Sequence, residues 1–315
     1  MPYWKEKRRG KKKYYYLTRS VRLPNGRVKT IQRLADPKER TGKYKDWFIE
    51  QEKRVLGDWA AKQYHADGVF TEDEIRKIES IRADYKRILS KLSKPQRKDL
   101  FDRFTVNFTY ESNAIEGNSL TLKDVRIVLF EKTMIKGKEL REIYETINSR
   151  KVVDWILRKK FKVAEKDLIR MHKMLVQNME IATGYKKIPN FLLDRNVKTA
   201  PPERVAAEME KLVRFYEGSK KTMHPLQLAA RFHGMFEKIH PFDDGNGRVG
   251  RFLANVALAN QGYPPIIIRK TQRIAYFKAL EDFDNGYTEN LERFMLERFK
   301  QTYRKFFEMS AKYAK

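Results

Sequence analysis

The chain has 315 residues, of which 68 are Lys or Arg and 41 are Asp or Glu, so its formal net charge is +27. It has no cysteine, which excludes disulfide frameworks, zinc ribbons, thiol nucleophiles and iron–sulfur clusters. Hydrophobic residues make up 41% of the chain, enough for the core of one large domain or two smaller ones. No apolar run approaches the roughly 20 residues of a membrane span, and the basic start lacks the apolar stretch of a signal peptide. We therefore expect a soluble, cytoplasmic protein.

Residues 1–40 are the most basic part of the chain, with 14 Lys or Arg against three acidic residues, so they carry +11 of the net charge. From Tyr14 to Leu34, β-branched and aromatic residues alternate with other residues. The Asn25-Gly26 pair between the two runs is a strong hairpin signal, because both residues tolerate the positive φ of a tight turn. We predict a small basic β-hairpin, which either binds an acidic partner such as nucleic acid or serves as a packing appendage.

After Arg40 the hydrophobic residues recur at helical spacing almost to the end of the chain. Thr71 precedes an acidic first turn, as an N-cap residue does. Between residues 184 and 200 the helical pattern lapses and indicates a short hairpin. We therefore predict an almost all-α protein without internal repeats. Its predicted helices are a first one that Gly68 ends, then 71–92, 96–115, 121–131, 137–160, 165–179, 202–217, 225–239, 246–260, 269–283 and 289–314.

The most informative stretch is HPFDDGNGRVGR, which runs from His240 to Arg251 between two helical segments. It is therefore a loop that leads into a helix N-terminus. Gly245, Asn246 and Gly247 permit positive φ, so that successive N–H groups turn toward one point and form an anion-binding nest. The dipole of the following helix strengthens such a nest. We expect this loop to bind phosphate.

Four side chains of the same stretch complement the nest. Arg248 and Arg251 are three residues apart, so they share one helical face and can bind phosphate oxygens. Asp244 supplies a hard oxygen ligand for a Mg²⁺ that bridges phosphates. His240 supplies an imidazole, the group best suited to accept a proton near neutral pH. The stretch thus predicts a nucleotide-phosphate site with a base beside it, whereas a transition-metal site at His240 and His233 is disfavoured because no further His or Cys is close in sequence.

At every specified position, this stretch resembles the HxFx[D/E]GNGRxxR signature of Fic-domain proteins. A second segment, Ser112 to Gly117, resembles the family's inhibitory motif [S/T]xxxE[G/N] and precedes the signature, as in class II Fic enzymes, whose inhibitory helix is N-terminal to the core. The resemblance covers about residues 101–299. It implies a Fic-domain helical bundle with a small β-hairpin flap over 101–315, with an inhibitory helix at about 103–116, preceded by the basic arm over 1–40 and a helical region over 41–100.

Fic enzymes typically transfer AMP from ATP to a Ser, Thr or Tyr hydroxyl of a target protein, so the resemblance implies a protein adenylyltransferase that uses ATP and Mg²⁺. In that role His240 would be the catalytic base and Asp244 the metal ligand. Glu116, with Ser112, would be inhibitory: its carboxylate would pair with Arg251 and occupy the cation that the γ-phosphate needs. The residues implied to bind the nucleotide or its phosphates are Gly245, Asn246, Gly247, Arg248, Arg251, Tyr276 and Asp284.

The hairpin predicted around residues 188–199 resembles the family's flap, along which a target segment would dock as an extra strand. Phe242 is expected to anchor the signature loop in the core. A homodimer is a further option, because family members often inhibit themselves as dimers. The implied docking residues of the flap are Lys187, Ile188, Phe191, Leu192 and Leu193.

The sequence leaves two alternatives open. Within the family, the same site could remove AMP from a target or transfer another nucleotide-derived group, such as phosphocholine or UMP. From a different class, the protein could be a nucleic-acid-associated regulator that acts through its basic N-terminal arm. A steep salt dependence of nucleic-acid binding, lost when residues 1–40 are deleted, would support the second alternative.

Overall fold

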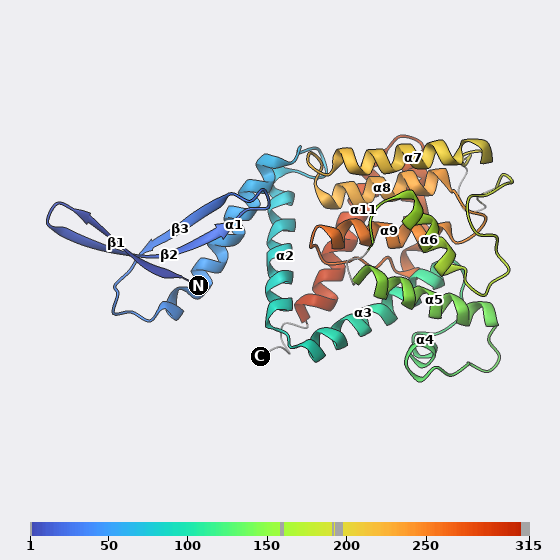
Figure 1. The fold of residues 1–315 in the computed structure, drawn as a ribbon, viewed down its shortest axis with the longest axis horizontal. Helices are drawn as coiled ribbons and strands as arrows, with labels where there is room; N and C mark the ends of the chain where they lie inside the picture. Colours follow the sequence, from blue (N-terminus) through green and yellow to red (C-terminus); the bar gives the residue numbers. More distant parts are fainter. Residues whose placement is uncertain (1, 158–160, 191, 193–197, 310–315) are drawn as a thin grey trace. The chain divides into compact units, whose positions relative to one another are not determined.

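The chain divides into two compact units, Met1–Asp84 and Tyr85–Lys315 (Figure 1). Most of the described residues lie in helices, which confirms the prediction of an almost all-α protein. In the part of the chain that the structure describes, no helix combines the length and the apolar character that crossing a membrane requires. This structure, a computed structural model, describes residues 2–157, 161–190, 192 and 198–309.

The first unit begins with a three-stranded antiparallel sheet in the order β1-β2-β3. Its strands are Tyr3–Arg9, Lys12–Arg22 and Val28–Leu34. The predicted hairpin corresponds to β2 and β3, and Gly26 in their turn has φ +84°. The prediction was wrong in omitting β1, because Tyr3 and Trp4 are followed by five charged residues, which show no alternation of hydrophobic and polar residues. Strand β1 pairs with β2 from Tyr3↔Thr18 to Arg9↔Lys12.

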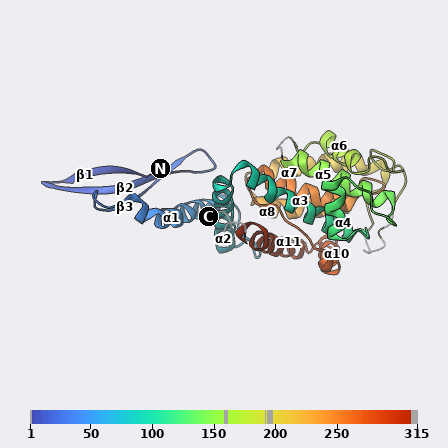
Figure 2. The ribbon, with the colours of Figure 1, turned by 90° about the horizontal axis from the view of Figure 1, so that it is seen from below.

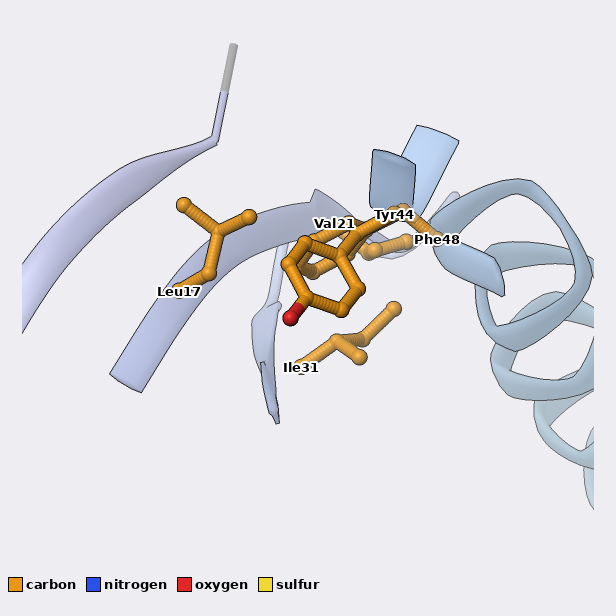
Figure 3. Close-up of a cluster of buried hydrophobic side chains, with 5 residues drawn as sticks. All are labelled: Leu17, Val21, Ile31, Tyr44 and Phe48. Atoms are coloured by element: carbon orange, nitrogen blue, oxygen red, sulfur yellow. The ribbon is translucent and has the colours of Figure 1, made fainter. Parts of the chain in front are cut away.

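One face of this sheet carries the hydrophobic core of the first unit. The 3₁₀ turn η1 (Thr41–Tyr44) leads into α1 (Lys45–Gln63), which packs on the sheet. Arg19 on β2 pairs with Glu52 on α1 at 2.6 Å, so the two elements are also joined by charge. The buried cluster between them, shown in Figure 3, consists of Leu17, Val21, Ile31, Tyr44 and Phe48.

Helix α2 (Glu72–Lys91) begins where the sequence predicts. The Oγ1 atom of Thr71 accepts a hydrogen bond from the N–H of Glu74 at 3.2 Å, so Thr71 is the N-cap. Arg76 pairs with Asp58 of α1 at 3.1 Å. Gly57 of α1 allows the two backbones to approach, because a Cβ atom there would lie 3.3 Å from the Cα of Arg76.

The second unit is built from helices. Predicted and observed bounds agree to the residue for α8 and α9, and the helix predicted over 289–314 changes to a π-helical turn, η4, at its C-terminal end. The last five residues of that prediction lie outside the described residues. The elements are α3 (Lys94–Ile115), α4 (Leu122–Arg126), η2 (Ile127–Glu131), α5 (Leu140–Leu157), α6 (Glu165–Leu175), α7 (Pro202–Ser219), α8 (Pro225–Ile239), α9 (Asn246–Asn260), η3 (Lys270–Gln272), α10 (Arg273–Asp284), α11 (Thr288–Thr302) and η4 (Tyr303–Glu308).

Helix α9 lies at the centre of this unit. It is apolar on nearly all sides, with Val249, Phe252, Leu253 and Val256 fully or almost fully buried, and such a helix is stable only inside a core. It packs against α8 and also contacts α3, α5 and α6. Figure 1 shows α9 among these helices, and Figure 2 shows α10 and α11 on the side of the unit opposite α6. The signature loop therefore joins the two central helices, α8 and α9.

The hairpin predicted between residues 184 and 200 is not formed by the described residues of that segment, which contain no strand. Instead, one end of the segment is joined to the signature loop and the other to the last residue of α8. The N–H of Lys186 donates to the carbonyl oxygen of Pro241 at 2.9 Å, and the N–H of Ala200 donates to that of Ile239 at 3.3 Å. Pro189 has no N–H for a ladder, which opposes strand pairing at this point. Phe191 and residues 193–197 lie outside the described residues.

Candidate functional site

His240 is the C-cap residue of α8. It adopts the left-handed conformation, with φ 51° and ψ 61°, and its N–H donates to the carbonyl oxygen of Phe236 at 3.0 Å. Its Nδ1 lies 3.3 Å from the carbonyl oxygen of Glu237, an atom that can only accept a hydrogen bond. The proton of the neutral ring is therefore assigned to Nδ1, which makes Nε2 the basic nitrogen.

The loop after His240 is held by Asn246 and Phe242. The Oδ1 atom of Asn246 accepts from the N–H of Phe242 at 2.9 Å, and its Nδ2 donates to the carbonyl oxygen of the same residue at 2.8 Å. Phe242 is fully buried, as expected of an anchor. The Asn246 amide therefore positions the loop, and the bond to Phe242 uses one of the two N–H donors of its Nδ2.

His172 of α6 supports the loop from the other side. Its ring stacks on Phe242 with centroids 3.9 Å apart and the planes 4° from parallel. Its Nε2–H donates to the carbonyl oxygen of Asp244 at 3.0 Å. Burial lowers the pKa of His172 to about 4, so the ring is neutral at physiological pH. A neutral ring keeps positive charge away from this side of the loop.

The predicted nest is formed differently from the expectation. Positive φ occurs at Gly245, with φ +82°, whereas Asn246 and Gly247 are already the first two residues of α9. Gly245 is the N-cap and provides no side chain to cap the helix. The first N–H groups of a helix have no intrahelical partners, so the anion-binding capacity here belongs to the first turn of α9 and its dipole.

Arg251, which is buried, and Glu116, which is partly exposed, form an ion pair beside this helix terminus. The Nη2 atom of Arg251 lies 2.7 Å from the Oε1 of Glu116 and donates to the carbonyl oxygen of Ser112 at 2.8 Å. Its Nε donates to the Oγ of Ser112 at 3.0 Å. Burial lowers the pKa of Arg251, but Glu116, together with Tyr276 and Glu237, outweighs the burial, so that the pKa is raised. The structure thus brings together the three residues that the resemblance links, Ser112, Glu116 and Arg251.

Gly247 makes room for this ion pair. A Cβ atom at Gly247 would collide with the Oε1 of Glu116 and would lie 3.0 Å from the Nη1 of Arg251. Gly247 is helical, so the glycine is required by space and not by backbone conformation. The carboxylate of Glu116 therefore lies directly against the first turn of α9, in the position where that turn would hold an anion.

Arg248 and Asp244 belong to a second cluster of charges, with two residues of α5. The Nη1 of Arg248 lies 3.3 Å from the Oε1 of Glu145, and its Nη2 lies 3.7 Å from the Oδ1 of Asp244. The Oδ2 of Asp244 is also paired with Arg141. The two arginines of α9 therefore bind to different helices: Arg248 contacts α5, and Arg251 contacts α3.

The remaining predicted residues are placed in three ways. Tyr276 is fully buried, and its hydroxyl is hydrogen-bonded to the Nε2 of His233 at 2.8 Å. Its ring centroid is 6.0 Å from the guanidinium of Arg251. Asp284 ends α10, and its carbonyl oxygen accepts from Lys238 at 2.9 Å, which places it near the end of α8 that carries His240. The flap residues Lys187 and Ile188 are exposed and Leu192 is half-buried, whereas Phe191 and Leu193 lie outside the described residues.

Across the described residues, no group of three or more His, Cys, Asp or Glu side chains could hold a metal ion. A Mg²⁺ bound through nucleotide phosphates needs one or two carboxylates from the protein, so this finding does not bear against Asp244 as a single ligand. The carboxylate of Asp244 is 39% exposed and supplies hard oxygens, which fits that ion. Arg141 occupies one of these oxygens in this structure.

Sequence reasoning missed His172, Arg141 and Glu145. His172 stood among helical residues with no recognisable pattern around it. Arg141 and Glu145 are four residues apart on α5, which indicates a local ion pair on a solvated face and gives no sign of Asp244. Their contact with the signature loop joins residues 103 positions apart and depends on the packing of α5 against α9.

Residues 162–258 match the Fic/DOC family model. Two curated relatives are Protein adenylyltransferase Fic from Drosophila erecta, 31% identical over 190 residues, and from Drosophila ananassae, 29% identical over 242 residues. The matches cover 59% and 75% of this chain but 38% and 48% of the relatives. This chain therefore spans less than half the length of the curated relatives it matches.

Solved structures show the same fold. A Fic domain-containing signaling protein from Bacteroides thetaiotaomicron is 27% identical, with a TM-score of 0.64 over 73% of this chain and 96% of that one. Fic-1 from C. elegans is 19% identical, with a TM-score of 0.67 over 87% of this chain and 80% of that one. The helical architecture and the signature loop agree with these matches, and residues 162–258 of this chain resemble a Fic domain.

Proposed function

We propose that this protein is a protein adenylyltransferase, which transfers AMP from ATP to a side-chain hydroxyl of a target protein and is held inactive by Glu116. The name of the curated relatives, Protein adenylyltransferase Fic, suggests the reaction. The observation that carries the proposal is the ion pair of Glu116 and Arg251 on the first turn of α9. This ion pair places a carboxylate on the anion site of α9. His240, the imidazole that the reaction needs, is the C-cap of the preceding helix α8.

In the proposed reaction His240 is the general base. With its proton on Nδ1 directed to the carbonyl oxygen of Glu237, Nε2 takes the proton of the target hydroxyl. The hydroxyl oxygen forms a bond to the α-phosphorus of ATP, and the bond from that phosphorus to the bridging oxygen of pyrophosphate breaks. The products are the AMP-modified protein, pyrophosphate and a proton on His240. Such transfers rest on positioning and charge stabilisation.

The chain provides charge stabilisation from the first turn of α9. The N–H groups of this turn and the helix dipole stabilise phosphate oxygens, because no side chain caps the helix at Gly245. Arg248 and Arg251 add two guanidinium groups that are already desolvated. Asp244 would hold Mg²⁺, which neutralises phosphate charge when it is bound.

Glu116 inhibits by acting as an internal anion. Its carboxylate lies on the first turn of α9 and takes the Nη2 of Arg251, so a nucleotide must displace it to engage both. Ser112 holds the guanidinium in place through its hydroxyl and carbonyl oxygens. This arrangement leaves Arg251 ready for a phosphate once the carboxylate is removed.

A second candidate reaction is the removal of AMP from a modified protein by the same site. The side chain of Glu116 is 35% exposed although its partner Arg251 is buried, so water can reach this carboxylate. A carboxylate beside a phosphate site can orient or activate that water. Transfer of another nucleotide-derived group would use the same anion site. It differs from AMP transfer only in the donor molecule that supplies the group.

The test compares two labels in the Glu116→Gly variant, with and without His240→Ala. AMP transfer predicts that α-labelled ATP with Mg²⁺ labels the protein itself, that γ-labelled ATP does not, and that His240→Ala abolishes the labelling. Labelling from γ-labelled ATP would mean phosphate transfer and would refute the proposal. If neither label is incorporated, release of AMP from an AMP-modified protein by the wild type would establish the second reaction instead.

A further inference from the structure

The sheet of the first unit has two faces of different character. In an antiparallel sheet, residues paired across strands lie on the same face, and neighbours along a strand alternate. Leu17, Val21 and Ile31 belong to the face that packs on α1 (Figure 3). The opposite face, here called the outer face, contains the residues in register with Tyr16. One contact confirms it: the Nζ of Lys7 lies 4.8 Å above the ring of Tyr16 and donates to the Oε1 of Gln32, which joins all three strands.

The outer face carries five cations and no acidic residue. Glu6 is the one carboxylate of the three strands, and its register places it on the face of α1, where it pairs with Arg8 at 2.8 Å and Lys13 at 3.5 Å. Among the described residues, no carboxylate lies within ion-pair distance of any cation of the outer face. All five are exposed: Lys5, Lys7, Arg9, Lys12 and Arg22.

The dimensions of this face fit duplex DNA. Three strand axes spaced about 4.8 Å apart cover roughly 10 Å, so the exposed side chains of this face can contact phosphates along the edge of a duplex groove. The 11 residues of β2 span roughly 36 Å, about one turn of the double helix. Lys5, Lys7 and Arg9 alternate along β1, so their charges recur about every 7 Å on one face. A regular row of cations matches a regular row of phosphates.

Single-stranded nucleic acid fits this face less well. Its binding relies on open aromatic rings on which bases stack. Tyr14 and Tyr16 of the outer face are half-buried, and the ring of Tyr16 is covered by the ammonium group of Lys7, which leaves Tyr3, 49% exposed, as the one open ring among the described residues of this face. One open ring cannot stack a row of successive bases, whereas the cations and polar side chains such as Thr30 suit phosphate contacts.

We propose that the outer face of the β1–β2–β3 sheet is a docking surface for duplex DNA, bound through its phosphates. This function goes beyond nucleotide transfer and uses residues that the site at α9 does not use. It gives the basic arm a role that depends on which face its cations occupy, and not only on how many there are.

The experiment measures the affinity of the full chain for a fluorescent 20-base-pair duplex over a series of salt concentrations. The variant Lys5→Gln/Arg9→Gln/Arg22→Gln should bind at least about tenfold more weakly than the wild type. The slope of log K against log[salt] should fall in magnitude by about 2 to 3, because each lost phosphate contact removes about 0.9. Circular dichroism and thermal melting of each variant show that the sheet is intact.

The matched control removes three cations from the other face of the same sheet: Arg8→Gln/Lys13→Gln/Lys29→Gln. It has the same net charge as the outer-face variant, so the proposal predicts a much smaller loss of affinity. Equal losses in the two variants would overturn the proposal. So would tighter binding of the corresponding single strand, or binding to anionic lipid vesicles but not to DNA. Since the assay contains no nucleotide, its outcome is independent of the adenylyltransferase activity.

Discussion

Replacing Glu116 with Gln removes the charge of the carboxylate while keeping its shape, and it should make the protein less stable but more responsive to ATP. Without that charge, Arg251 remains buried beside Ser112 with no anion. The phosphates of ATP can then supply the missing anion, which stabilises the variant more than the wild type. Stability and nucleotide response are therefore expected to change in opposite directions.

The magnitude follows from the burial of the pair. Removing one partner of a fully buried ion pair costs about 3–5 kcal/mol. Here the Glu116 side chain is 35% exposed, and Arg251 keeps both contacts with Ser112, so we expect a loss of about 1–2 kcal/mol. For a unit of this size, that loss lowers the melting temperature by about 2–8 °C. Nucleotide at 100 times its Kd raises the free energy of unfolding by about 2.7 kcal/mol.

The assay is thermal unfolding of the wild type and of Glu116→Gln, each with and without ATP and Mg²⁺. The upward shift caused by ATP should be larger in Glu116→Gln, because the wild type must first break the ion pair. Glu111→Gln is the matched control, since Glu111 is on the same helix but accepts from the N–H of Lys270 and does not contact Arg251. Equal ATP shifts in the wild type and in Glu116→Gln would refute this reasoning.

Three further predictions concern the support of the site. His172 has a pKa of about 4 in the folded protein, whereas in the unfolded chain it takes up a proton below its ordinary pKa of about 6.5, so the free energy of unfolding should fall by up to about 3 kcal/mol as the pH drops from 6.5 to 4. His172→Gln should reduce this loss, as measured by denaturant unfolding at a series of pH values. An unchanged pH profile would contradict the prediction. Gly250→Ala should cost about 1–3 kcal/mol, because its Cβ would meet the carboxylate of Glu237 and lie 2.9 Å from the ring of His233, whereas Gly218→Ala, with nothing within 4 Å, should cost nothing in the same melts; equal effects would contradict the packing. Arg141→Met should lower the Mg²⁺ concentration needed for half-maximal ATP stabilisation about two- to fivefold, because it frees an exposed carboxylate of Asp244, and Arg141→Lys should change it less; no shift would mean that Arg141 does not compete with the ion.

The sequence was most informative where residue type constrains the backbone. Helices α8 and α9 were predicted to the residue because Pro225 follows His224 at the start of the first, and the glycine-containing loop separates it from the second. The pairing of Glu116 with Arg251 was implied by two motifs that lie far apart in the chain. Strand β1 was missed because residues 5–9 are all charged and show no alternation of hydrophobic and polar residues.

The internal roles of the loop residues could not be predicted, because they depend on contacts across the fold. Asn246 was expected to contact phosphate, yet its amide is engaged by the backbone of Phe242. Gly247 was expected to have positive φ, yet it is helical and is required because Glu116 packs against it. The contact of Arg141 with Asp244 likewise arises from the packing of α5, which no local pattern reports.

The central claim is that the carboxylate of Glu116 withholds Arg251 and the first turn of α9 from ATP. The most direct measurement is the initial rate of self-labelling from α-labelled ATP with Mg²⁺ in the wild type, Glu116→Gly and Glu111→Gly. We predict a rate at least about tenfold higher in Glu116→Gly, equivalent to about 1.4 kcal/mol, and no increase in Glu111→Gly. A wild-type rate equal to that of Glu116→Gly, or an equal increase in both variants, would contradict the claim.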